Sequence, residues 1–377
     1  MTGHHAPPRW AVVGNPENRR VGLFTRAVLD AGLPAPRVVP WAAVLRDGGA
    51  DFAADELVRL DSPGENAEVD RTLRGLDDPT RVEGGARWHA RFTAAVGTLR
   101  GGIRLDDPAE LAVLFDKRHC HRALDRAGVP VPQSPTSGAA VPVRGWDDVR
   151  ALMAAHRMPR VFVKPAHGSS ASGVIAVETA GRGRIRATTS VETAGDGSLH
   201  NSLRLRRITR EPELAALVDA LAPEGLHLER WWPKASLDGV TADLRVVVVA
   251  GRATHAVLRT SRSPMTNLHL GGRRGDLAAA VAAAGPHWAD ALRTCERAAA
   301  CFPGTLCVGV DLLPAVGWRR YAVAEVNAFG DLLPGLTGLP GSGAEGLDTY
   351  AAQIAAAPRH VQQLHTRNHH RAPAPSR

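Results

Sequence analysis

Short apolar runs alternate with helical periodicity in the N-terminal part of the chain. Residues 10–13 form an apolar run that ends in a Gly-Asn-Pro turn, which predicts a strand. Apolar positions recur at helical spacing over residues 21–31 and stop at Gly32, which predicts a helix with a glycine C-cap. Residues 37–40 predict the next strand. The strand–helix–strand order favours parallel pairing, so we expect an α/β unit here.

A further apolar run, residues 58–65, predicts a strand that continues into a turn. This turn is either a plain surface turn or a loop that lines a substrate cleft, and the pattern leaves both readings open. The N-terminal unit lacks a GxGxxG motif between its first strand and helix. A dinucleotide site is therefore not expected in it.

A long helix is predicted after this unit. Asp107 and Pro108 have the residue types that favour an N-cap and the first helical position. The apolar periodicity continues to Leu124 and stops at Gly128, so we expect one continuous helix that carries Lys117.

A helix over residues 146–155 and a strand over 160–164 are predicted next. The loop 166–173 consists of small residues and leads into an apolar strand over 174–177. Together these segments predict a hairpin with a long, flexible tip.

The C-terminal half mixes helices with strands. Helices are predicted over residues 211–221, 277–284 and 288–300, and strands over 226–229, 244–249, 253–258, 305–312 and 321–327. From residue 359 onward no apolar period remains, which predicts disorder. We expect an N-terminal α/β domain over 1–105, α+β lobes over 106–225 and 226–358, and a disordered tail over 359–377.

Composition narrows the class of protein. With 377 residues, 44% hydrophobic and 22% charged, the chain is typical of a globular protein of two or three packed units. No apolar run reaches the roughly 18 residues that cross a bilayer, and no signal segment is present at the N-terminus, so we expect a cytoplasmic protein with no membrane partner. The four cysteines form no CxxC pair, which indicates neither a zinc site nor a disulfide framework.

The net charge of +8 raises the question of nucleic acid. The basic residues are scattered and no nucleic-acid-binding motif is present, so we favour a basic cleft for phosphates or an acidic substrate. Only three of the 46 basic residues are lysines: Lys117, Lys164 and Lys234. Unless this is chance, they mark sites where a compact ammonium is required and a planar guanidinium does not fit.

Phosphate binding is one candidate chemistry of the small-residue loop. Gly168 and Gly173 permit close backbone approach, and Ser169 and Ser170 leave room for a triphosphate. Such loops are more often linkers, but this one follows Lys164 at the end of a strand, from which an ammonium can reach phosphate oxygens. The chain has no GxxxxGK[ST] motif.

A magnesium site is the second candidate. Glu325 and Asn327 are two residues apart on a predicted strand and therefore share a face. Asp311 ends the preceding strand and is expected to lie alongside. Two carboxylates and an amide oxygen suit Mg²⁺ that is held partly by nucleotide phosphates, with Mn²⁺ as an alternative.

Arginines and aromatic residues are further candidates for the functional site. Arg245 and Arg259 lie on the two strands of one predicted hairpin, where they suit a phosphate or carboxylate, and Asn267 follows in the next loop. A salt bridge between Asp243 and Arg245 is the alternative for that strand. For the rest of the nucleotide, Glu229 is a candidate to bind the ribose hydroxyls, and Trp231 and Trp232 are candidates to form an apolar slot for adenine. The two tryptophans are equally compatible with plain core packing.

In their order along the chain, these motifs resemble the ATP-grasp superfamily, in particular its glutathione synthetase and ribosomal-protein glutamate ligase branch. The resemblance spans about residues 105–345. Its five motifs are Phe115-Asp116-Lys117, Val161-Phe162-Val163-Lys164-Pro165, Glu229-Arg230-Trp231-Trp232-Pro233, Asp243-Leu244-Arg245 and Val308-Gly309-Val310-Asp311 with Glu325-Val326-Asn327.

The resemblance implies an N-terminal Rossmann-like pre-ATP-grasp domain followed by a two-lobed ATP-grasp fold, an α/β and α+β protein. It implies that Lys117 and Lys164 bind ATP phosphates, and that Arg245, Arg259 and Asn267 are catalytic. Lys234, the third lysine, is also predicted to contribute to nucleotide binding. The chain departs from the family at Ala328-Phe329-Gly330, where a Pro-Gly turn is frequent, and at His167 in the cradle.

The implied reaction is the ATP-dependent activation of a carboxylate as an acyl phosphate and its joining to an amine. Small-molecule or peptide carboxylates and amines are the expected substrates, and the oligomeric state is left open. Two alternatives remain: a small-molecule kinase on the same nucleotide site, and a nucleotide-dependent binding module.

Overall fold

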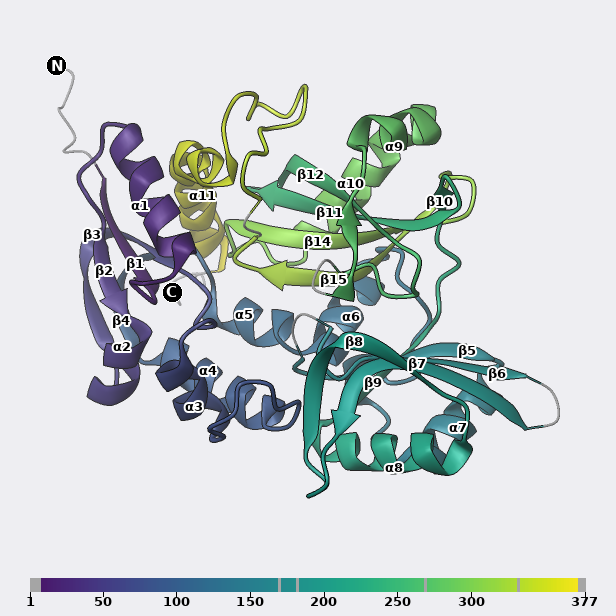
Figure 1. Cartoon of the computed structure of the whole chain (residues 1–377). Coiled ribbons are helices and arrows are strands. Elements are labelled where there is room, and N and C mark those ends of the chain that lie inside the picture. The colour runs from purple at the N-terminus through teal and green to yellow at the C-terminus, as the bar shows by residue number, and fades with distance from the viewer. Residues whose placement is uncertain (1–7, 169–170, 181–182, 268–269, 331–332, 372–377) are drawn as a thin grey trace, which may run out of the picture.

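Three β-sheets organise the molecule (Figure 1). The computed structural model describes residues 8–168, 171–180, 183–267, 270–330 and 333–371, except for the side chains of 368–371. One sheet is parallel and two are antiparallel, and a pair of helices packs on one side of each antiparallel sheet. The chain is thus a mixed α/β protein.

The N-terminal sheet has the strand order β2-β1-β3-β4, and all of its pairings are parallel. Its strands are β1 (Arg9–Gly14), β2 (Arg37–Pro40), β3 (Ala50–Leu60) and β4 (Leu99–Arg104). Its helices are α1 (Arg19–Asp30), α2 (Trp41–Asp47), α3 (Ala67–Arg74) and α4 (Gly85–Gly97). The predicted strands at residues 10–13 and 37–40 and their parallel pairing are confirmed.

The long helix predicted from Asp107 is wrong as a single element. It is divided into α5 (Pro108–Leu114) and α6 (Lys117–Arg126). The break arises because the Asp116 carboxylate accepts hydrogen bonds from the backbone N–H groups of Arg118 and His119 and so caps a new helix. Consequently Lys117 is the first residue of α6 rather than a mid-helix residue.

The second sheet is antiparallel, in the order β8-β7-β6-β5-β9. Its strands are β5 (Arg160–Pro165), β6 (Ile175–Ala180), β7 (Arg184–Thr193), β8 (Leu199–Ile208) and β9 (Leu226–Arg230). Helices α7 (Trp146–Ala155) and α8 (Glu211–Leu221) pack on one face through a shared apolar core. In Figure 1 they lie below the sheet, so its other face is turned toward the rest of the molecule.

The third sheet has the order β13-β12-β11-β14-β15, with β10 beside β11. Its strands are β10 (Ser236–Leu237), β11 (Val240–Val249), β12 (Arg252–Ser261), β13 (Arg273–Arg274), β14 (Cys307–Pro314) and β15 (Tyr321–Ala328). Helices α9 (Leu277–Ala284) and α10 (Trp288–Ala299) cover the face away from the second sheet (Figure 1). The opposite face of this sheet packs at one end against α11 (Thr349–Arg371), through residues such as Val247 and Val257, and is otherwise turned toward the second sheet.

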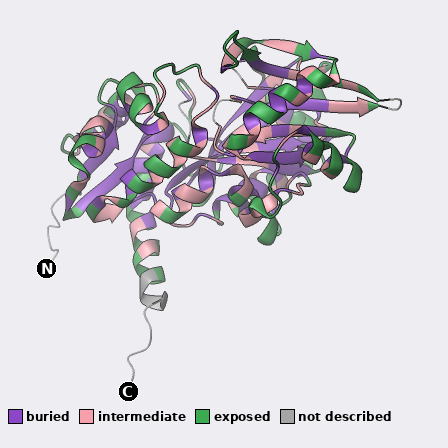
Figure 2. Cartoon of the chain, turned by 90° about the horizontal axis from the view of Figure 1, so that it is seen from below, coloured by how far each residue is buried: buried purple, intermediate pink, exposed green. Residues whose placement is uncertain are grey.

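The disordered tail predicted from residue 359 is wrong for its described part. Helix α11 (Thr349–Arg371) runs through this region. Ala357 and His360 are buried, and α11 packs beside α1 through a shared apolar cluster. The sequence pattern misses the helix because only its first half has an apolar face, while its far end projects from the body (Figure 2). Within the residues described, none of the helices is both long and apolar enough to span a bilayer.

The carboxyl of Asp106, just after β4, is buried, and its titration is expected to make the stability of the folded protein depend on pH. It accepts a hydrogen bond from the Leu60 N–H at 3.0 Å, and burial raises its pKa to about 7. Because this pKa lies above that of the unfolded chain, the folded state retains the proton longer, and stability falls as the pH rises from about 4 to 7. One pKa unit corresponds to about 1.4 kcal/mol, so the effect amounts to a few kcal/mol.

We therefore expect Asp106→Asn to flatten the dependence of the unfolding free energy on pH between about pH 4 and pH 7, as measured by urea unfolding. Asp55→Asn, at a carboxylate 65% exposed, is the matched control. A variant Asp106→Asn with the wild-type slope would show that Asp106 is not the group responsible.

Candidate active site

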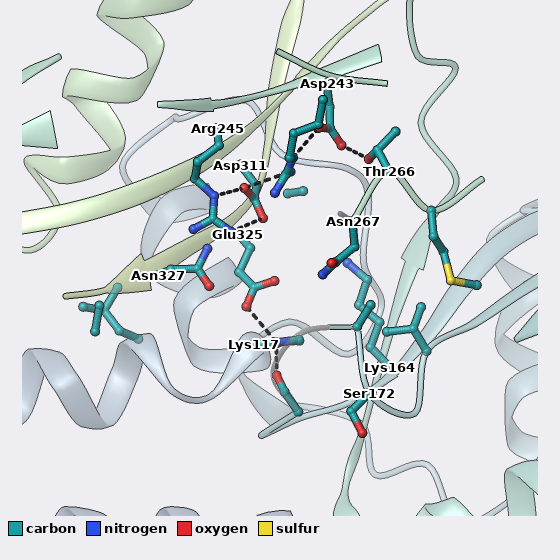
Figure 3. A pocket seen from close by; sticks show the side chains of 18 of the residues that line it. Lys117, Lys164, Ser172, Asp243, Arg245, Thr266, Asn267, Asp311, Glu325 and Asn327 are labelled. Carbon is teal, nitrogen blue, oxygen red and sulfur yellow. Dashed lines mark hydrogen bonds and ion pairs between the residues drawn. The ribbon is translucent and has the colours of Figure 1, made fainter. Parts of the chain in front are cut away.

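A cavity of about 930 Å³ lies between the facing sheets. Most of the residues predicted for the site line it, and Figure 3 shows several of them directed into a common space. The predicted residues among its lining are Lys117, Lys164, Gly168, Glu229, Trp232, Lys234, Arg245, Arg259, Asn267, Asp311, Glu325 and Asn327. Ser169 and Ser170 lie outside the described residues.

Lys117 joins three elements at the cavity. From the first position of α6, its ammonium donates to Glu325 Oε1 on β15 at 2.8 Å and to the carbonyl of Gly168 at 2.6 Å. The backbone N–H of Lys117 also donates to the Ala166 carbonyl at 2.9 Å. The glycine-rich loop, α6 and the third sheet therefore meet at this side chain.

Lys164 is the second lysine, on β5, and its ammonium forms an ion pair with Glu229 on the neighbouring strand β9. Burial alone would lower the pKa of Lys164, but Glu229 and Glu325 outweigh burial and hold it above its ordinary value. Burial would likewise raise the pKa of Glu229, yet Lys164 and His227 lower it to about 2. Both partners are charged. The contacts of Glu229 are thus with Lys164 and His227, and its predicted role toward a ribose stays a prediction.

Asp311, Glu325 and Asn327 come together across two adjacent strands. Asp311 on β14 is the register partner of Glu325 on β15, and Asn327 is the partner of Gly309. The amide nitrogen of Asn327 donates to the Gly309 carbonyl at 3.3 Å, which leaves the amide oxygen as the group available to a ligand. Burial raises the pKa of Asp311 despite Arg245. Burial would also raise the pKa of Glu325, but Lys117 and Lys164 together lower it.

These three oxygen-bearing groups fit a magnesium ion. Carboxylate and amide oxygens are its usual protein ligands, and it typically keeps several ligands from water and phosphate. The described residues contain no group of three or more His, Cys, Asp or Glu side chains that could hold a metal. Three protein oxygens would leave the other positions of an octahedral Mg²⁺ to oxygens from outside the protein.

Arg245 and Arg259 form a wall beside the carboxylates. Arg245 contacts Asp311 at 2.6 Å, and Arg259 contacts Asp311 at 3.0 Å and Asp243 at 2.8 Å. The alternative of an Asp243–Arg245 salt bridge is wrong. Register decides the pairing, because Asp243 lies opposite Arg259 on β12 while Arg245 lies opposite Asp311 on β14.

Lys234 and Thr266 complete this wall. The ammonium of Lys234 lies 3.5 Å from Asp243 and donates to the Thr266 hydroxyl at 3.1 Å. Burial, and then the charge of Arg259, lower the pKa of Lys234. Asp243 thus contacts two cations, Arg259 and Lys234, and accepts a hydrogen bond from the hydroxyl of Thr266.

Trp231 and Gly173 do not line the cavity. Trp231 packs on the Phe162 ring, with centroids 5.1 Å apart, and under the guanidinium of Arg160 at 4.4 Å, so plain packing accounts for it. Gly173 has a φ of +74°, and a Cβ there would lie 2.5 Å from Pro165 Cγ. Glycine is needed at this position to close the loop over Pro165.

His167, unusual in the loop, lies at its buried base. Nδ1 lies 3.0 Å from the Phe115 carbonyl, and the ring stacks on His89 of α4 with centroids 4.2 Å apart. Burial, and then His89, lower the pKa of His167 to about 4, so the ring is neutral at physiological pH. It anchors the loop rather than facing the cavity.

The sequence interpretation missed a wall contributed by the N-terminal part. Arg20, together with the residues that follow β3, lines the same cavity, so the reading of residues 58–65 as a cleft-lining loop is the one the structure supports. Ser62, Gly64 and Glu65 belong to the loop that the sequence left open as cleft-lining. The lining residues that were missed include Arg20, Asn66, Met265, Thr266 and Phe329. Strand order was the missing signal, since the position of β1 next to β3 is not visible in a local pattern.

Comparison with solved structures identifies the fold. No protein-family model and no curated protein matches the chain in sequence. The structure of D-cycloserine synthetase DcsG matches 93% of this chain and 99% of that chain, at 16% identity and a TM-score of 0.55.

Two further solved structures are similar to this chain over nearly its whole length. ATP-grasp ligase PsnB, complexed with its minimal precursor, matches 94% of this chain and 100% of that chain, at 17% identity and a TM-score of 0.51. Macrocyclase MdnC, bound with precursor peptide MdnA from Microcystis aeruginosa MRC, matches 93% and 99%, at 12% identity and a TM-score of 0.50. At these identities the similarity concerns architecture, and on that ground this chain has the ATP-grasp fold.

Proposed function

We propose that this protein is an ATP- and Mg²⁺-dependent ligase that activates a carboxylate as an acyl phosphate and joins it to an amine, releasing ADP and phosphate. The observation that carries the proposal is the convergence of two lysines, a carboxylate–carboxylate–amide trio and two arginines in one cavity of an ATP-grasp fold. The names of the structural relatives, a synthetase, a ligase and a macrocyclase, support the ligase class by analogy.

The nucleotide phosphates are assigned to Lys117 and Lys164. Each ammonium now faces a carboxylate, Glu325 or Glu229, which keeps it charged and in place. A triphosphate entering beneath the glycine-rich loop offers these cations further oxygens, and charge-assisted hydrogen bonds of this kind are among the stronger polar contacts. Trp232 is assigned to the base.

The metal ligands are Asp311, Glu325 and Asn327. Mg²⁺, when bound with the nucleotide, neutralises phosphate oxygens, and Mn²⁺ is an alternative ion. The residues themselves hold two negative charges next to Arg245 and Lys117. These cations can turn toward phosphate or substrate when a metal replaces them as counter-ions.

In the first step, a carboxylate oxygen of the donor attacks the γ-phosphorus, and the bond to the bridging oxygen of ADP breaks. In the second, the amine nitrogen attacks the acyl carbon and phosphate leaves with the former carboxylate oxygen, while the amine's protons pass to phosphate and solvent. Arg245 and Arg259 are assigned to the charge on the transferred phosphoryl group and on the tetrahedral intermediate, with Asn267 beside them.

A kinase acting on a hydroxyl requires a general base, and neither Asp243 nor His167 is suited to that role. Among the described residues that line the cavity there is no histidine. Asp243 is bound to Arg259, Lys234 and Thr266, so it is poorly placed to accept a proton.

The division of the chain belongs to the same proposal. Residues 1–105 form a Rossmann-like domain, 106–225 the lobe with Lys117 and Lys164, and 226–358 the lobe with the metal ligands. The parallel sheet of the first segment and the two antiparallel sheets of the others support these boundaries.

Oxygen transfer tests the ligase reading directly. We expect ¹⁸O from a labelled carboxylate to appear in the released phosphate when the enzyme turns over ATP with a panel of ¹⁸O-carboxylate amino acids and short peptides, as measured by mass spectrometry. Unlabelled carboxylates in ¹⁸O-free water are the control. Phosphate that remains attached to the organic product, with no label in free phosphate, would make the protein a kinase.

A further inference from the structure

Lys234 is the third lysine at the cavity, and its surroundings differ from those of the other two. The ammonium groups of those two each pair with a glutamate. The ammonium of Lys234 donates to the Pro264 carbonyl at 3.2 Å and to the Thr266 hydroxyl at 3.1 Å, and it lies 3.5 Å from Asp243 Oδ2. These three acceptors match in number the three N–H donors of an ammonium, so protein atoms account for all of its donors.

A rigid base carries this ammonium. Lys234 pairs with Ala315 in an isolated antiparallel bridge, and the N–H of Ala235 donates to the Pro314 carbonyl at 2.8 Å. The Lys234 side chain is only 7% exposed, and that of Asp243 only 4%. A guanidinium is wider and its donors lie in one plane, so an arginine does not match three acceptors grouped around a single buried nitrogen.

The β12–β13 loop, of which residues 262–267 and 270–272 are described, is the segment that this ammonium holds. The loop closes tightly on itself, because the Gly272 N–H donates to the Asn267 carbonyl at 3.1 Å. A Cβ at Gly272 would lie 2.4 Å from the Thr266 carbonyl, so glycine permits this close approach. These local contacts shape the loop, and its attachment to the walls of the cavity comes from other contacts.

Two groups of contacts attach the middle of the loop. Met265 and Leu270 are buried and share an apolar cluster with Val174 and Ala176, at the start of β6 in the second sheet. The polar contacts with Lys234 attach the loop to the side of the third sheet. The loop therefore touches both walls of the cavity, and its place at the third sheet depends on this polar anchor.

The polar anchor lies next to residues assigned to the reaction. Asp243 accepts hydrogen bonds from the Thr266 hydroxyl and from Arg259 Nε, the latter at 2.8 Å. Asn267 directly follows Thr266 and lines the cavity (Figure 3). One buried carboxylate thus holds an arginine of the wall and also the residue that precedes Asn267.

We propose that Lys234 is a positioning residue: its ammonium fixes the middle of the β12–β13 loop to β11 and so holds Asn267 in the cavity, and it does not bind the nucleotide phosphates. The predicted contribution of Lys234 to nucleotide binding is then indirect, because its three donors are used by the protein. The inference rests on the proposed ligase function, in which Asn267 acts beside Arg245 and Arg259, and adds the group that holds Asn267 in place.

Hydrogen exchange tests the attachment of the loop without turnover. We expect Lys234→Met to speed amide exchange in residues 262–272 by about tenfold, because a loop that loses an anchor opens more often. Mass spectrometry of proteolytic peptides measures this. Thr266→Val removes one acceptor without changing the charge and should act in the same direction, whereas Lys234→Arg should not restore the wild-type rate.

Two nucleotide probes separate positioning from phosphate binding. Calorimetry is performed in Mg²⁺ with a non-hydrolysable ATP analogue, and with ADP plus aluminium fluoride, which mimics the phosphoryl group during transfer. We expect Lys234→Met to leave the dissociation constant of the ATP analogue unchanged and to weaken that of ADP–aluminium fluoride by about tenfold, as for a lost hydrogen bond to a charged group. Asn267→Ala should cause the same selective loss, and the double variant no further loss, since both changes remove one contact.

Arg262→Met is the matched control, because it removes an exposed cation from the same loop, outside the cavity lining. It should change neither the exchange rate nor either dissociation constant. Wild-type exchange in Lys234→Met, or a loss of ATP-analogue affinity as large as that in Lys164→Ala, would overturn the inference. A wild-type protein that binds no ATP analogue would instead overturn the proposed function, while hydrogen exchange would still decide what holds the loop.

Discussion

Replacing Glu325 by glutamine is expected to reduce turnover more than the roughly 10–100-fold that is typical for groups one shell away from a metal. The substitution preserves shape and removes one of the two carboxylates of the trio, while Lys117 loses its ionic partner at 2.8 Å. Excess Mg²⁺ should restore part of the activity, because the remaining ligands still offer a weakened site. Steady-state kinetics over a Mg²⁺ series measures this, and Mn²⁺ electron paramagnetic resonance with an ATP analogue reports binding without turnover.

The matched control is Glu178→Gln on β6, a carboxylate that also pairs with arginines but lies outside the cavity. It should leave the Mg²⁺ dependence unchanged. Full activity of Glu325→Gln, or wild-type activity without added divalent metal, would show that the trio has a structural role only.

Lys164→Ala is expected to have two effects that a second variant separates. It removes a phosphate contact, which should weaken ATP binding by about one to two orders of magnitude. It also leaves Glu229, 3% exposed, without its cation, and breaking a buried pair in this way typically costs about 3–5 kcal/mol of stability. Calorimetric titration with a non-hydrolysable ATP analogue and urea unfolding measure the two effects independently.

The double variant Lys164→Ala/Glu229→Gln removes both charges of the pair. It should recover much of the stability but none of the nucleotide affinity, because the phosphate contact is still missing. Lys164→Arg should not restore full affinity, since a planar fork does not fit a compact buried site. Arg160→Ala, on the same strand but exposed, is the control. Wild-type affinity in Lys164→Ala would remove this lysine from the nucleotide site.

Features that follow from local periodicity were predictable. The alternation of residues along a strand places Glu325 and Asn327 on one face, and the structure adds Asp311 as the register partner that the prediction had put alongside. Several helices begin or end within a residue of the predicted position, including α7 and α8. The lysine count directed attention to three positions that all line the cavity. Their roles toward a nucleotide stay predictions until they are measured.

Features that depend on capping or distant packing were not predictable. The apolar period continues through Asp116, and only the hydrogen bonds of its carboxylate reveal a second helix start. Likewise, α11 continues past residue 359 because α1 covers one of its faces, a contact between the two ends of the chain. The polar, periodless sequence there resembles a disordered tail when it is considered alone.

The sequence by itself determined which side chains share a face of each strand, because side chains alternate between the two faces along the strand. Only the tertiary structure decided how those side chains pair: Asp243 with Arg259 rather than with Arg245, and Lys164 with Glu229. It also placed the loop after β3 at the cavity, through the position of β3 beside β1. Register and strand order are set by packing between segments far apart in the chain, and no local pattern records them.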